Sequence, residues 1–113
     1  MTQADKVREL NDAFRKGERP ELGRIMLTSG VRHLAAAWPL GDMAVYIKVQ
    51  TFDEFTKDND PWDEHDFGSF DFAGEKCFWK IDQYNKTLDG GSEDPADETK
   101  TTRVLTIMLA SEY

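Results

Sequence analysis

The stretch Phe67-Gly68-Ser69-Phe70-Asp71-Phe72-Ala73-Gly74-Glu75-Lys76-Cys77-Phe78-Trp79-Lys80-Ile81-Asp82-Gln83-Tyr84 predicts a β-hairpin, and the rest of the fold follows outward from it. Residues 67–72 and 76–84 form two arms rich in aromatic side chains, which favour strands, and Ala73-Gly74 can form the turn between them. Because side chains alternate between the faces of a strand, the second arm should present one mostly apolar face. The side chains expected on that face are Cys77, Trp79 and Ile81.

Segments on both sides of the hairpin carry their own signals. Residues 3–16 predict an amphipathic helix, because apolar side chains recur on one helical face. Residues 24–28 predict a short strand, and residues 31–38 predict a short helix. Residues 43–55 fit either structure, since they alternate like a strand but also place apolar residues on one helical face. In residues 103–110 both the odd-numbered and the even-numbered positions are largely apolar, which indicates a central strand covered on both faces. A buried helix is the competing interpretation.

These segments predict one α+β domain over residues 1–113, a length suited to a single domain. The N-terminal amphipathic helix should pack on a mainly antiparallel sheet of about four strands. Two polar loops, residues 56–66 and 85–101, connect the elements. The strands expected in the sheet are residues 24–28, 67–72, 76–84 and 103–110.

The formal net charge of −8 is unevenly distributed along the chain. Residues 53–98 hold fifteen Asp or Glu against four Lys, whereas the segments before and after them are close to neutral. Such a segment repels nucleic acid and attracts a basic partner, although a solvated acidic surface that keeps the protein soluble is the plainer interpretation.

Cysteine content and hydropathy point to the cytoplasm. Cys77 is the single cysteine, so no internal disulfide is possible, which fits a reducing compartment. The polar N-terminus lacks the apolar core of a signal peptide, and no run approaches the roughly 18 apolar residues of a membrane span. We therefore expect a cytoplasmic protein with no membrane partner.

Three parts of the sequence carry a family resemblance. They are Phe52-Asp53-Glu54-Phe55 through Asn59-Asp60-Pro61-Trp62-Asp63-Glu64-His65-Asp66-Phe67-Gly68, then Phe78-Trp79-Lys80-Ile81-Asp82-Gln83-Tyr84, then Gly91-Ser92-Glu93-Asp94-Pro95-Ala96-Asp97 through Thr102-Arg103-Val104-Leu105-Thr106-Ile107-Met108-Leu109-Ala110-Ser111-Glu112-Tyr113. Together these strings resemble the domain of unknown function 3768 family. The likeness covers nearly the whole chain and is strongest from residue 52 onward.

The resemblance implies a setting rather than an activity. The family is expected mostly in alphaproteobacteria, often on plasmids and other mobile elements, which carry small inhibitors of host defences. It favours a helix over residues 43–55, and the segment Ala35-Ala36-Ala37-Trp38-Pro39-Leu40 departs from its usual pattern. The expected function is a non-enzymatic acidic binding protein, an inhibitor of a host nucleic-acid-targeting defence system of the anti-CRISPR or antirestriction type.

In that hypothesis the acidic segment occupies a basic protein surface that normally holds phosphates, with no direct contact to nucleic acid. Trp62 either folds back onto the core or, if it is exposed, anchors the interface. The oligomeric state is left open, and self-association through an apolar surface is a third interpretation. The residues expected to contact the partner are Asp58, Asp60, Trp62, Asp63, Glu64, Asp66, Glu93, Asp94, Asp97 and Glu98.

The alternative hypothesis is a small hydrolase or nuclease-like enzyme that uses His65 with Glu64, Asp66 or Asp82. Carboxylates beside a histidine can share acid–base work or bind a divalent ion. The spacing matches no established metal template, neither an EF-hand loop nor H-E-x-x-H, so the sequence predicts no metal site and no cofactor.

Overall fold

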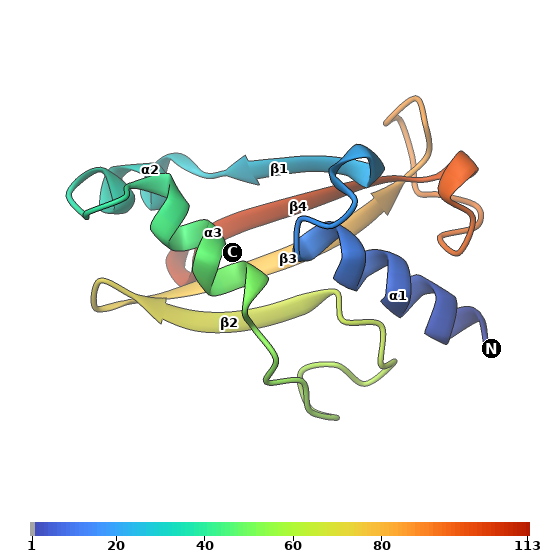
Figure 1. Ribbon diagram of the computed structural model, residues 1–113, viewed down its shortest axis with the longest axis horizontal. Coiled ribbons are helices and arrows are strands. Elements are labelled where there is room, and N and C mark those ends of the chain that lie inside the picture. The colour runs from blue at the N-terminus through green and yellow to red at the C-terminus, as the bar shows by residue number, and fades with distance from the viewer. Residues whose placement is uncertain (1) are drawn as a thin grey trace.

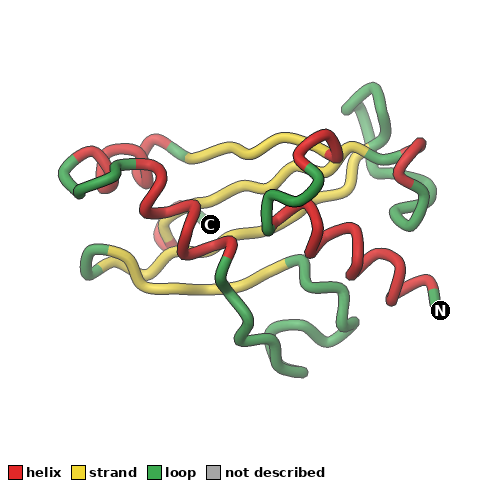
Figure 2. The backbone as a smooth tube through the Cα atoms, in the orientation of Figure 1, coloured by secondary structure: helices red, strands yellow, loops and turns green. Residues whose placement is uncertain are grey.

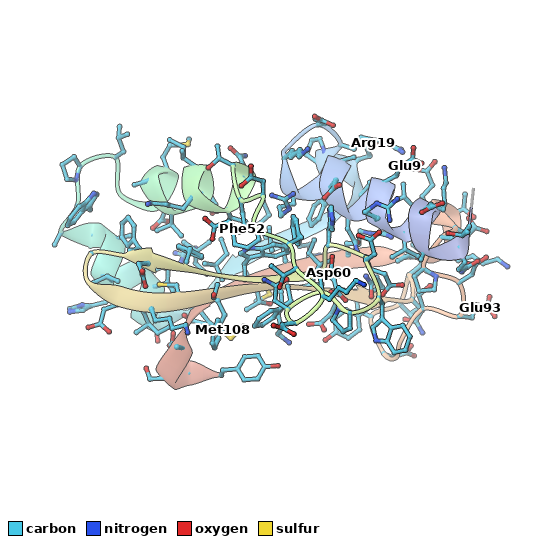
Figure 3. All side chains as sticks on the ribbon, turned by 90° about the horizontal axis from the view of Figure 1, so that it is seen from below. Glu9, Arg19, Phe52, Asp60, Glu93 and Met108 are labelled. Atoms are coloured by element: carbon cyan, nitrogen blue, oxygen red, sulfur yellow. The ribbon has the colours of Figure 1, made fainter. Side chains whose placement is uncertain are left out.

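The computed structural model describes residues 2–113 and confirms an α+β architecture of three helices and one four-stranded sheet (Figure 1). The elements are α1 (Gln3–Arg15), β1 (Gly23–Leu27), α2 (Ser29–Ala36), α3 (Asp42–Gln50), β2 (Phe67–Phe72), β3 (Glu75–Tyr84) and β4 (Thr102–Leu109), with short 3₁₀ helices at Pro20–Leu22, Glu98–Lys100 and Ala110–Glu112. Figure 3 views the sheet nearly edge-on and shows α1 and α3 on one of its faces, whereas α2 lies near the end of the sheet where β1 finishes (Figure 1).

The helix α1 begins and ends where its sequence signals predict. The Thr2 hydroxyl accepts a hydrogen bond from the Asp5 backbone N–H, and the Asp5 carboxylate accepts one from the Thr2 N–H, which forms a capping box. Gly17, at a φ of +79°, allows the chain to leave the helix in the left-handed region. The predicted helix over residues 3–16 is confirmed to within one residue.

The sheet has the strand order β1-β4-β3-β2. β3 pairs antiparallel with both β2 and β4, whereas β1 pairs parallel with β4, so the sheet is mixed and mostly antiparallel as predicted. β4 is an interior strand, but its side chains alternate between buried and half-buried, so only its helix-facing side is well covered. The expectation of a strand buried on both faces is therefore met on one face only.

Two helices settle the ambiguous part of the sequence. Residues 42–50 form α3, so the helical alternative for residues 43–55 is confirmed, with the helix ending at Gln50. α2 starts at Ser29 rather than residue 31, because the Thr28 hydroxyl accepts a hydrogen bond from the Val31 N–H and caps the helix there. Among the described residues, no helix combines the length and apolar character that a membrane crossing requires.

The core lies between the helices and the sheet and centres on Trp79, which is fully buried on β3. Cys77 and Ile81 flank it on the same face, as the alternation of the second hairpin arm predicted. Two charged side chains, Arg15 and Arg103, are also fully buried, which the sequence analysis did not anticipate. The two long loops lie toward the end of the molecule that carries the N-terminus (Figure 2).

Candidate functional site

The loop between α3 and β2, residues 51–66, is closed by its own hydrogen bonds. The Asn59 side-chain oxygen accepts a hydrogen bond from the Thr56 N–H at 3.0 Å, and its amide donates to the Glu54 carbonyl oxygen at 3.0 Å. The Asp60 N–H donates to the Thr56 carbonyl oxygen at 2.8 Å. The chain is thereby turned back toward α1 by the residues that the sequence marked as turn formers.

Asp60 is buried inside this loop, with 6% of its surface exposed. Its carboxylate accepts hydrogen bonds from the backbone N–H groups of Glu64, at 3.0 Å, and His65, at 3.2 Å. Figure 3 places it near the middle of the molecule. Asp60 therefore organises the loop, and because it is buried it offers little charge at the surface, so its contact with a partner stays a prediction.

His65 lies at the centre of a polar cluster that connects the loop to α1. Its Nδ1 lies 2.9 and 3.0 Å from the two carboxylate oxygens of Asp12, and because a carboxylate only accepts hydrogen bonds, Nδ1 must donate. The ring stacks on Phe55 with the centroids 3.7 Å apart and the planes at 5°. Nε2 faces Asp60 Oδ2 at 3.7 Å and Asp63 Oδ1 at 3.6 Å, distances too long for hydrogen bonds.

The carboxylates expected to assist His65 occupy other places. Burial raises the pKa of Glu64, and the charges of Asp66 and Asp60 raise it further. Burial likewise raises the pKa of Asp66, with the charge of Asp60 as the second cause. Asp82 pairs with Lys80 at 2.8 Å along β3. The sequence thus identified the histidine, whereas the geometry gives it different acidic neighbours.

The surface of the loop carries the exposed members of the predicted partner set. Trp62 is 76% exposed, so it does not fold back onto the core. Asp58, four residues earlier in the chain, is also exposed. Asp63 is also exposed, but its carboxylate is held by Arg8 at 2.8 Å, with Arg8 donating to the Asp63 carbonyl oxygen as well.

The second acidic loop, residues 85–101, uses its carboxylates within the fold. Asp94 accepts a hydrogen bond from the Gln3 side chain at 2.9 Å, and Glu98 forms an ion pair with Arg19. Asp97 accepts hydrogen bonds from the Thr99 hydroxyl and N–H, which lower the pKa of Asp97. Glu93 is exposed and lies 3.7 Å from the ammonium of Lys100. The predicted single acidic face is therefore two groups, one in each loop, and both are partly neutralised by basic or hydrogen-bonding partners.

A family model described as a protein of unknown function (DUF3768) matches residues 27–112. The chain belongs to the DUF3768 family. The match confirms the resemblance seen in the sequence and contains both acidic loops and all of β2, β3 and β4. No curated protein and no solved structure matches the chain.

The helix α1, which lies outside the matched DUF3768 range, supplies the buried polar residues that hold the loop of residues 51–66. Arg15 donates from Nη1 to the carbonyl oxygens of Val49 and Phe52, at 2.8 and 3.0 Å, and from Nη2 to Asp12 at 3.1 Å. Its guanidinium also lies 5.2 Å from the ring centroid of Trp79. Sequence reasoning missed Arg15 because a basic residue in the last turn of a helix is usually solvated there.

Asn11 is a second buried polar residue of α1 in this DUF3768 protein, and it links β4 to the loop of residues 51–66. Its side-chain oxygen accepts a hydrogen bond from Arg103 Nε at 2.7 Å, and its amide donates to the Glu64 carbonyl oxygen at 2.9 Å. Arg103 in turn donates to the Pro95 carbonyl oxygen at 2.7 Å, and burial lowers the pKa of Arg103 to about 10. Asn11 and Arg103 are 92 residues apart in the sequence, so no local sequence pattern could predict their hydrogen bond.

Two hollows flank the His65–Phe55 stack. One, of about 690 Å³, is lined by Phe55, Thr56, Lys57, Asp60, Pro61 and Asp63. The other, of about 310 Å³, includes Asp12, Arg15, Phe55 and His65 in its lining. The candidate functional site of this DUF3768 protein is therefore the loop of residues 51–66 together with the face of α1 on which it rests.

Proposed function

We propose that the protein is a non-enzymatic binding protein whose acidic loop, residues 53–66, docks on a basic surface of a partner protein. The observation that supports this most directly is the exposure of Trp62 at the surface of a loop whose backbone is fixed by buried Asp60. Tryptophan is enriched among the residues that dominate interface energetics. A loop that is already ordered loses little conformational entropy when it binds.

The charge around Trp62 favours a basic partner. Asp53, Glu54 and Asp58 are exposed on the same loop, and the whole chain has a net charge of −8. This charge disfavours direct contact with nucleic acid, since phosphates would be repelled. A protein groove that normally holds phosphates fits the surface better, and such grooves occur in nucleic-acid-targeting defence complexes. An inhibitor that occupies one, of the anti-CRISPR or antirestriction type, is the finer form of the proposal.

The test is retention of partner proteins from a bacterial lysate on immobilised wild-type protein and on Trp62→Ala and Asp58→Lys variants. Both side chains are exposed, so neither change should unfold the protein. We expect the wild type to retain a basic protein that both variants lose. We also expect retention to fall steeply between low and high salt, because salt screens exposed charge pairs.

Matched controls come from surfaces away from the loop. Glu75→Lys makes the same charge change at the exposed first residue of β3, and Tyr113→Ala removes an exposed aromatic side chain at the C-terminus. Both controls should bind like the wild type. Retention that survives Trp62→Ala and Asp58→Lys, or that falls equally in the controls, would contradict the proposal.

The second candidate function is hydrolysis with His65 as the acid–base residue. The observation that favours it is the Asp12 carboxylate against Nδ1, which orients the ring as in catalytic Asp–His pairs. In this function the carboxylate that works with His65 is Asp12, in place of the Glu64, Asp66 or Asp82 named in the prediction. Release of p-nitrophenol from phosphate and carboxylate esters tests it: loss of activity in His65→Gln but not in Asp58→Asn is expected, and equal activity in both would exclude it.

A further inference from the structure

We propose that Asp60, Asp63 and His65 form a binding site for one divalent transition-metal ion, for which Zn²⁺ is the best-matched probe. One oxygen of each carboxylate and one ring nitrogen of the histidine lie within 4.8 Å of one another. The three ligands lie in the same loop as Trp62, but metal binding does not require the Trp62 side chain, so variants of Trp62 and of the ligands test the two proposals separately.

The distances between the ligand atoms fit a small ion. Nε2 lies 3.7 Å from Asp60 Oδ2 and 3.6 Å from Asp63 Oδ1. Zn²⁺ binds nitrogen and carboxylate oxygen at about 2.0–2.2 Å, so two ligands at tetrahedral positions lie about 3.3–3.6 Å apart. The observed separations are close to this edge length, whereas they exceed hydrogen-bond distances and therefore leave Nε2 without a hydrogen bond to either carboxylate.

A different group orients each of the three ligands from behind. Asp12, on α1, accepts the hydrogen of His65 Nδ1 and leaves Nε2 to face the carboxylates with its lone pair. Arg8, also on α1, holds Asp63 through Oδ2 at 2.8 Å and leaves Oδ1 toward the histidine. A carboxylate that fixes the ring of a coordinating histidine is the usual second layer of protein metal sites.

The backbone supplies the orientation of the third ligand. Asp60 Oδ1 accepts the hydrogen bond of the Glu64 N–H at 3.0 Å, and the His65 N–H lies between both oxygens at 3.2 and 3.3 Å. The Asp60 side chain is 3% exposed. Phe55, stacked on the ring at 3.7 Å, prevents the imidazole from turning away. The ligand positions are thus set by α1, by the loop backbone and by the core.

The net charge of the three ligands and the open space beside them also suit a metal ion. Two carboxylates and a neutral imidazole carry a charge of −2, which a divalent ion balances. A hollow of about 690 Å³ adjoins Asp60 and Asp63, so a fourth coordination position can hold water or a ligand.

The test is titration of chelator-treated, full-length protein with ZnCl₂ by isothermal calorimetry. We expect one ion per chain, at least tenfold weaker binding in Asp63→Asn, and loss of binding in His65→Gln. Asp58→Asn removes the same charge from the same loop and should bind within about twofold of the wild type. Trp62→Ala should also bind normally, which separates failure of this site from failure of the partner surface.

Three calorimetric results would contradict the proposed metal site. Absence of wild-type binding, unchanged affinity in Asp63→Asn, or equal losses in Asp58→Asn and Asp63→Asn would each refute the site. Because Asp63 is exposed, its substitution keeps the test valid even if His65→Gln unfolds. The ¹⁵N spectrum of the His65 ring gives a separate readout: Zn²⁺ should shift Nε2 and leave Nδ1 protonated, and coordination through Nδ1 would contradict the geometry.

Discussion

The two acidic loops share a composition but differ in how their carboxylates are placed. In the loop of residues 85–101, Thr87 and Asn85 donate to Asp89, and Thr99 donates to Asp97, so the pKa of each of these carboxyls is lowered. In the loop of residues 51–66, burial and neighbouring charges raise the pKa of Glu64. Asp89 and Asp97 are thus stabilised by donors, whereas Glu64 and Asp66 are buried beside other negative charges. Crowding of this kind is more typical of a functional site than of a structural turn.

Two buried arginines, one supporting each loop, should show the largest difference between the loops. Arg15→Met would leave the Phe52 carbonyl oxygen without its donor and would remove one donor each from the Val49 carbonyl oxygen and from Asp12, so the free energy of unfolding should fall by about 3 kcal/mol. Arg103→Met should lower it by only about 1 kcal/mol, because burial already penalises the charge of Arg103, as its pKa of about 10 indicates. Urea denaturation of both variants checks the order.

If the Arg103 variant lost more stability than the Arg15 variant, the loop of residues 85–101 would be the more dependent on its buried charge. The comparison drawn above would then be reversed. Arg24→Met, an exposed substitution on β1, serves as the control and should stay within about 0.5 kcal/mol of the wild type.

The next largest effect is expected at Asp60, compared with Asp97, since each of these aspartates accepts backbone N–H hydrogen bonds within its own loop. Asp60→Ala leaves the backbone N–H groups of Glu64 and His65 buried without an acceptor, so the free energy of unfolding should fall by about 2 kcal/mol. Asp97→Ala, which frees the exposed N–H and hydroxyl of Thr99, should have a smaller effect because water can replace both hydrogen bonds. Thermal unfolding of the two variants side by side tests this, and equal losses would show that burial of Asp60 contributes nothing.

A smaller effect appears in the dependence of stability on pH. A raised pKa in the folded protein means that ionised Glu64 and Asp66 destabilise it, and this penalty is relieved as the pH falls through the raised values toward the ordinary 4.5 and 3.8. The double variant Glu64→Gln, Asp66→Asn should therefore be slightly more stable than the wild type at pH 7 and no more stable near pH 4, since solvent screening keeps the penalty at the partly exposed Glu64 small.

The matched pair Asp89→Asn, Asp97→Asn should show the opposite sign. The lowered pKa values of these groups mean that their ionised forms stabilise the fold above pH 3.8, so removal of the charges should destabilise it at pH 7. The difference should disappear only as the pH falls through the lowered values. Stability measured by urea denaturation from pH 3 to pH 8 tests both pairs, and the same sign in both would refute the comparison.

The smallest effect is expected at Trp62. Trp62→Ala removes a side chain that is 76% exposed, so the free energy of unfolding should change by less than about 0.5 kcal/mol. Trp79→Ala, in the centre of the core, should lower it by about 3–5 kcal/mol. Thermal unfolding distinguishes the two, and a large loss in the Trp62 variant would place that residue in the fold rather than on a binding surface.

Much of the fold could be predicted because its signals are local. The hairpin of residues 67–84 and the capped helix α1 depend on alternation, turn residues and a capping box within a few positions. The parallel pairing of β1 with β4 could not be predicted, since their paired residues, such as Gly23 and Arg103, are far apart in the sequence. This strand pairing is determined by tertiary packing rather than by local strand propensity.

Only part of the candidate site could be predicted from the sequence, because some of its residues are also far apart in the chain. His65 and its acidic neighbours were identified from their density in one stretch, whereas Asp12 lies 53 residues away and approaches through the docking of α1. The burial of Asp60 and the exposure of Trp62 depend on how the loop turns back, which composition does not specify.

The most direct measurement is a ¹³C NMR titration of the side-chain carboxyl groups of the folded protein. Glu64 and Asp66 should titrate above the ordinary values for their residue types, and Asp89 and Asp97 below them. If all four carboxyls titrated at ordinary values, or the two loops exchanged directions, the carboxylates of residues 51–66 would not be crowded and the account of that loop as the functional one would be contradicted.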